Sequence, residues 1–102
     1  MNWDRISELR EEVGEDDLAE VIALFCEEVE EVLAILANAS VADIPGHLHF
    51  LKGSALNIGF DSVSTLCLRE ETKLKEDPDA KPDIACIQKY YATSKSELEG
   101  LF

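Results

Sequence analysis

The most constraining feature of this sequence is a run of apolar residues that recurs at helical spacing between residues 18 and 36. Its members follow one another at intervals of 4, 3, 4, 3 and 4 residues, which places them on one face of an α-helix. We therefore predict a long amphipathic helix that ends at about Ala37, with Asp17 and Glu20 forming a capping box at its start. The apolar face consists of Leu18, Ile22, Phe25, Val29, Val32 and Leu36.

The same periodicity predicts a short helix before this one and a third helix after it. The first helix ends at Gly14, and the third has Asp43 as its cap, Pro45 in its first turn and Gly59 just beyond its end. The predicted inward residues are Trp3, Ile6, Leu9 and Val13 in the first helix, and Ile44, Leu48, Leu51, Ala55 and Ile58 in the third.

Two more helices are predicted on either side of the stretch KEDPDAKPD, whose prolines and aspartates indicate a loop. The fourth helix starts at Asp61 or Ser62, and the last follows Asp83. Their inward residues are Val63, Leu66, Cys67 and Leu74 in the fourth helix, and Ile84, Ile87, Tyr91, Ser94, Leu98 and Leu101 in the last. These patterns together predict an all-α fold: an antiparallel four-helix bundle with a short extra N-terminal helix, formed by residues 1–102 as one domain.

The composition narrows the classes of partner. There are 22 Asp and Glu against 9 Lys and Arg, and the formal net charge of −13 argues against binding to nucleic acid or to anionic membranes. Three widely spaced cysteines predict reduced, mostly buried thiols and no zinc cluster. No segment approaches the roughly 18 apolar residues of a membrane span, and the N-terminus has no apolar leader pattern. We expect a cytoplasmic monomer.

One segment, HLHFLKGSALNIGF from His47 to Phe60, has no acidic residue and contains both histidines. On a helical wheel, His49 falls roughly 140° from the centre of the apolar face and is expected to face solvent, whereas His47 falls at the flank, roughly 60° away. The two rings point in directions about 200° apart, so they cannot share a metal ion. From the pattern, His47 is structural and His49 is the candidate functional residue.

Lys52 and Gly53 lie within one turn of His49 on the wheel. A lysine there could neutralise an incoming phosphoryl group, and a glycine in an exposed helical position, which costs about 1 kcal/mol relative to alanine, would leave room beside the imidazole. A carboxylate in this place would repel an anion and favour the protonated ring, which is not nucleophilic. The segment is therefore compatible with a phosphoryl-accepting histidine and with an ordinary surface histidine, and the residues alone leave both interpretations open.

The residues from His49 to Gly59, HFLKGSALNIG, resemble the signature of histidine-containing phosphotransfer (HPt) domains. The matching residues are His49, Leu51, Lys52, Gly53, Ser54, Ala55 and Gly59. The resemblance implies that His49 accepts a phosphoryl group on Nε2, that Lys52 assists the phosphate electrostatically, and that Gly53 provides clearance. It also implies a phosphorelay carrier without kinase activity. Its partners would be receiver domains of response regulators or of hybrid sensor histidine kinases.

The resemblance further implies that this chain has no cofactor of its own and that a divalent metal ion sits on the partner receiver domain. We expect the docking face to include the surroundings of His49 and, on the second helix, Ala19, Ala23, Ala34, Glu27 and Glu30. One residue departs from the family pattern: Glu70 stands where an aliphatic core residue is usual, which predicts a fourth helix that is rotated or shortened there. The alternatives are a helical adaptor without the chemistry and an enzyme, such as a histidine kinase or a metal-dependent hydrolase.

Overall fold

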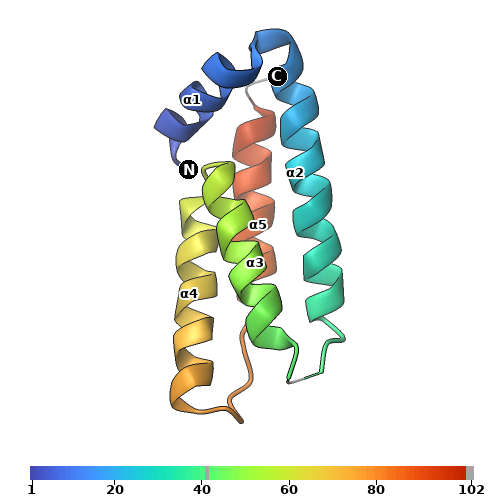
Figure 1. The fold of residues 1–102 in the computed structure, drawn as a ribbon, viewed down its shortest axis with the longest axis vertical. Coiled ribbons are helices and arrows are strands. Elements are labelled where there is room, and N and C mark those ends of the chain that lie inside the picture. The colour runs from blue at the N-terminus through green and yellow to red at the C-terminus, as the bar shows by residue number, and fades with distance from the viewer. Residues whose placement is uncertain (41, 101–102) are drawn as a thin grey trace.

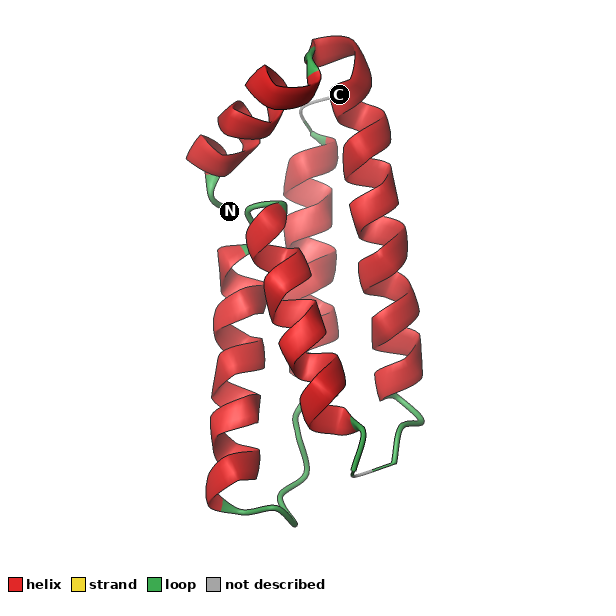
Figure 2. Cartoon of the chain, in the orientation of Figure 1, coloured by secondary structure: helices red, strands yellow, loops and turns green. Residues whose placement is uncertain are grey.

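The computed structural model describes residues 1–40 and 42–100, and within these residues the chain forms five helices and no strand. The helices are α1 (Trp3–Val13), α2 (Glu15–Leu36), α3 (Ile44–Asn57), α4 (Asp61–Glu76) and α5 (Ile84–Glu99). All five predicted helices are therefore present (Figure 2). The predicted inward position of Leu101 lies outside the described residues.

The helices form an elongated bundle of 45 × 22 × 20 Å. Helices α2, α3, α4 and α5 lie side by side along its long axis, and α1 lies across one end (Figure 1). Helix α3 packs most extensively against α4 and also contacts α2, while α5 contacts both α4 and α2. The outward face of α3 is thus bordered by α4 on one side and by α2 on the other.

The start of α2 differs from the prediction. The helix begins at Glu15, directly after Gly14, so Asp17 lies inside the first turn and does not form a capping box with Glu20. Gly14 takes a φ of 85°, which lets the chain pass from α1 into α2 without further linker residues. Three acidic residues in the first turn, Glu15, Asp16 and Asp17, interact favourably with the positive end of the helix dipole instead.

The ends of α3 follow the prediction more closely. Asp43 is the N-cap residue and Pro45 lies in the first turn, although the Asp43 carboxylate accepts a hydrogen bond from Ser40 Oγ at 2.9 Å and none from the helix. At the other end, Gly59 has a φ of 75°. Its N–H donates to the carbonyl of Leu56 at 3.2 Å, and the N–H of Phe60 donates to that of Ala55 at 2.8 Å, the pattern of a Schellman motif.

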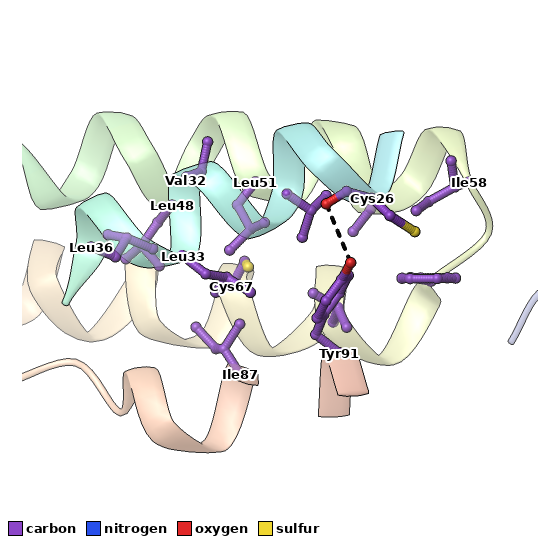
Figure 3. Close-up of a cluster of buried hydrophobic side chains, with 14 of the residues drawn as sticks. Cys26, Val32, Leu33, Leu36, Leu48, Leu51, Ile58, Cys67, Ile87 and Tyr91 are labelled. Carbon is purple, nitrogen blue, oxygen red and sulfur yellow. Dashed lines mark hydrogen bonds between the residues drawn. The ribbon is translucent and has the colours of Figure 1, made fainter. Parts of the chain in front are cut away.

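The core contains most of the residues that the periodicity assigns to it, with all of the labelled side chains of Figure 3 converging between α2, α3, α4 and α5. The Tyr91 hydroxyl donates a hydrogen bond to the Cys26 carbonyl at 3.3 Å and so links α5 to α2.

Cys26 and Cys67 are buried free thiols, as predicted, and Cys86 is partly exposed. The predicted inward position of Trp3 is wrong. Its side chain is exposed, because the short helix α1 buries only its two central apolar residues, Ile6 and Leu9.

Glu70 occupies a core position of α4, and the predicted rotation or shortening of that helix is wrong. Helix α4 continues to Glu76, and Glu70 is 0% exposed. Its Oε1 atom lies 3.1 Å from a guanidinium nitrogen of Arg69 and 3.3 Å from Lys73 Nζ, two cations whose side chains are about half exposed. The hydrogen bond to Glu70 raises the pKa of Arg69. Two flanking cations thus let a carboxylate replace an aliphatic residue without changing the register.

Candidate functional site

His49 is carried on the outward face of α3, and its side chain is 75% exposed. His47, two residues earlier, is partly buried. The residues that anchor this orientation are Leu48 and Leu51, which are fully buried on the opposite face of the helix. The structure therefore separates the two histidines as the helical wheel predicts, and the His49 ring is the more accessible of the two.

Gly53 lies one turn beyond His49 in the interior of α3. No heavy atom outside its immediate surroundings in the helix lies within 4 Å of the place where a Cβ would stand, and its φ is not positive. Neither packing nor backbone conformation therefore requires a glycine at this position. The space above Gly53 is open, and any side chain added there would extend into the surface next to the imidazole.

Lys52 is directed towards α4, where it meets a carboxylate that the sequence analysis did not place in the site. Its Nζ lies 3.2 Å from Glu71 Oε1 and donates a hydrogen bond to Oε2 at 3.4 Å. The same Oε2 atom lies 3.8 Å from Nδ1 of His49. Glu71 is therefore a third member of the site, and the expectation that the surroundings of His49 are free of acids is wrong.

The expectation failed because it considered α3 alone, whereas Glu71 comes from α4. One signal was available: the inward positions of α4 continue from Val63 and Cys67 to an adjacent pair of glutamates, Glu70 and Glu71. Acids are seldom buried unless a cation pairs with them. Glu70 meets its cations on α4 itself, and Glu71, whose side chain is 10% exposed, meets Lys52 across the α3–α4 interface.

The arrangement distinguishes the two ring nitrogens of His49. Nδ1 lies 3.8 Å from Glu71 Oε2 on α4, so Nε2 is the ring nitrogen that does not face this carboxylate. When Nδ1 carries the proton of a neutral imidazole, Nε2 has a free lone pair. The site therefore presents a nucleophilic nitrogen, a lysine one turn away, and open space above Gly53.

Four of the five α2 residues predicted for the docking face lie towards α5. Ala19, Ala23 and Glu27 line a depression of about 290 Å³ between α2 and α5, which also contains Lys95. Lys95 Nζ is 3.2 Å from Glu30 Oε1, so Glu30 also faces α5. The docking role of these residues and of Ala34 stays a prediction, because a helical wheel identifies a side of α2 without saying which neighbour covers it.

Two classes of feature do not occur in the described part of the chain. Residues 1–40 and 42–100 contain no group of three or more His, Cys, Asp or Glu side chains that could hold a metal ion. No helix within the same residues is long and apolar enough to cross a membrane.

Comparison with known proteins gives one family and two relatives. Residues 20–100 match the family model described as "Hpt domain". The phosphorelay protein LuxU of Vibrio vulnificus, in the sequences from strains YJ016 and CMCP6, is 28% identical over 105 residues, which cover 96% of this chain and 91% of LuxU. No solved structure gives a significant match.

Proposed function

Because the chain belongs to the Hpt domain family and is therefore a histidine phosphotransfer protein of a phosphorelay, we propose that it accepts a phosphoryl group on His49 from the aspartate of one receiver domain and passes it to another. The observation that carries this proposal is the exposed His49 ring, whose Nδ1 and not Nε2 faces Glu71, next to Lys52 and to the open surface of Gly53. We further propose that α2–α5 form the antiparallel four-helix bundle predicted from the sequence, with α1 as the extra helix.

In the proposed step, the lone pair of Nε2 attacks the phosphorus of an aspartyl phosphate. The N–P bond forms as the P–O bond to the aspartate breaks, and the aspartate leaves as a carboxylate, so no further proton acceptor is needed. Nδ1 keeps its proton, which faces Glu71. Phosphoryl transfer depends mainly on positioning and on neutralisation of charge. His49 provides the nucleophile, Lys52 the positive charge and Gly53 the room for the partner.

The partners that we propose are receiver domains of response regulators or of hybrid sensor histidine kinases. The chain brings no cofactor of its own in this scheme, and the divalent metal ion belongs to the receiver domain. We propose a monomeric cytoplasmic carrier, neither an ATP-dependent kinase nor a protein that binds nucleic acid or membranes. The charge of −13 supports the exclusion of anionic partners.

The proposal is tested with a receiver domain carrying ³²P on its aspartate. Label should move to the wild-type chain and to His47→Gln but not to His49→Gln, because both variants lose one imidazole of the same helix and only one loses the outward nucleophile. Transfer to His49→Gln, or its loss in a folded His47→Gln, would contradict the assignment. Binding of the receiver without transfer of label would indicate an adaptor instead, and stable labelling by ATP alone would indicate a kinase.

A further inference from the structure

The pair formed by Lys52 and Glu71 changes the charge that an incoming phosphoryl group meets. Lys52 has a side chain that is 22% exposed, and its ammonium group lies 3.2 and 3.4 Å from the two oxygens of Glu71. The Glu71 side chain is 10% exposed, and in the described part of the chain its ionic contacts are with Lys52 and with Nδ1 of His49. The lysine beside His49 is therefore already engaged by a carboxylate from another helix.

Moving Lys52 away from Glu71 is unfavourable, because it would leave a largely buried carboxylate without its cation. The two groups together have no net charge, so a phosphoryl group on Nε2 must compete with Glu71 for the ammonium group. A lysine without such a partner would stabilise the phosphorylated form more strongly.

We propose that Glu71 is a positioning residue that restrains Lys52 in the resting protein and thereby lowers the stability of the phosphohistidine, which favours onward transfer. This inference rests on the proposed function of His49. When the phosphoryl group leaves, the N–P bond breaks, a P–O bond forms to the aspartate of the next receiver, and Nε2 recovers its lone pair. Lys52 then returns to Glu71, so the ion pair that phosphorylation disturbs is restored by transfer.

The main experiment compares the wild-type chain with Glu71→Gln, which keeps the shape of the side chain and removes its charge. Each protein is phosphorylated with phosphoramidate, a small donor that needs no partner, and is then mixed with a receiver domain. Glu71→Gln should shift the equilibrium towards phosphorylated His49 by about fivefold or more, since about fivefold corresponds to two unit charges about 4 Å apart in bulk water, where their interaction is weakest. An unchanged equilibrium, or a shift towards the receiver, would overturn the proposal.

The action through Lys52 is tested by repeating the substitution in a Lys52→Met background. If Glu71 acts by restraining the lysine, Glu71→Gln should change the equilibrium less than about twofold when Lys52 is absent, and a full shift in that background would refute the mechanism. Glu70→Gln is the matched control, because it removes the same charge one residue away, on the side of α4 where Arg69 and Lys73 lie. It should leave the equilibrium unchanged. Circular dichroism identifies the variants that remain folded.

Failure of the carrier function and failure of this inference give different results. If no receiver exchanges phosphoryl groups with the wild-type chain, the proposed function fails, and the lifetime of the phosphohistidine formed by phosphoramidate still tests Glu71. Glu71→Gln should then lengthen that lifetime in the presence of Lys52, since a free ammonium group stabilises the phosphorylated state. An equal or shorter lifetime would overturn the role of Glu71 whatever the partner is.

Discussion

Substitutions of Gly53 should affect the stability of the fold and the rate of phosphotransfer in opposite directions. It lies in the interior of α3, its φ is not positive, and an added Cβ would meet no atom within 4 Å. Alanine is therefore compatible with the structure, and Gly53→Ala should raise the free energy of unfolding by about 1 kcal/mol through helix propensity and the smaller entropy of the unfolded chain. For a domain of this size, that corresponds to a melting temperature about 4–8 °C higher.

The effect on phosphotransfer should have the opposite sign. A side chain at position 53 extends into the open surface next to His49, where in the proposed function a partner brings an aspartate to Nε2. A displacement of about 1 Å in a reacting geometry can cost a hundredfold in rate. We expect Gly53→Leu to slow transfer from a labelled receiver by at least about tenfold and Gly53→Ala to have a smaller effect. Both are measured as initial rates of ³²P transfer, with thermal unfolding followed by circular dichroism.

Ala92→Leu is the matched control, since Ala92 is an exposed residue of another helix, α5. It adds the same side chain to a helix surface and should leave transfer unchanged. Normal transfer by a folded Gly53→Leu would refute the idea that the glycine provides clearance. A lower melting temperature in Gly53→Ala would refute the structural half of the reasoning, which holds that nothing in the fold requires a glycine there.

Two further predictions concern the core. Glu70→Leu should raise the free energy of unfolding, measured in urea, by about 1 kcal/mol. The reason is that Glu70 Oε2 has no hydrogen-bond partner among the described residues, and the two cations near Oε1 are half exposed. A lower free energy of unfolding would show that the ion pairs of Glu70 stabilise the fold more than a leucine does. Burial raises the pKa of the Cys67 thiol from 9.0 to about 12. The folded state therefore binds more protons between those values, and stability should fall as pH rises, by up to about 1.4 kcal/mol per unit. Urea unfolding at pH 8 and 10 tests this, and Cys67→Ala should show a smaller decrease.

The helices were predictable because each one is encoded by its own apolar stripe and by residues at its ends. Gly59 illustrates this: a glycine after the last inward residue predicts a C-terminal cap, and its φ of 75° confirms it. Asp83 likewise caps α5 by accepting a hydrogen bond from the Cys86 N–H at 3.0 Å. The start of α2 was not predictable in the same way, because several acidic residues in succession are all compatible with a helix start and Gly14 determined which one begins the helix.

The features of the site that depend on one helix were also predictable, whereas those that depend on the packing of neighbouring helices were not. The exposure of His49 and the open position of Gly53 depend on the periodicity of one helix, so a helical wheel was sufficient to predict them. The neighbours of α2 depend on which helix packs on each side, so a wheel could not predict that Ala19 and Ala23 line a depression next to α5. A helical wheel describes the faces of one helix and does not show which other helices pack against them.

Glu71 shows why that difference matters for function. The acid-free segment around His49 suggested a site with the single positive charge of Lys52, yet the fold adds a carboxylate from α4 that lies within 4 Å of both groups. A free lysine would favour keeping the phosphoryl group, whereas a lysine paired with Glu71 favours passing it on. A carrier has to do both in turn, and an ion pair that opens when the phosphoryl group arrives and closes when it leaves meets both demands.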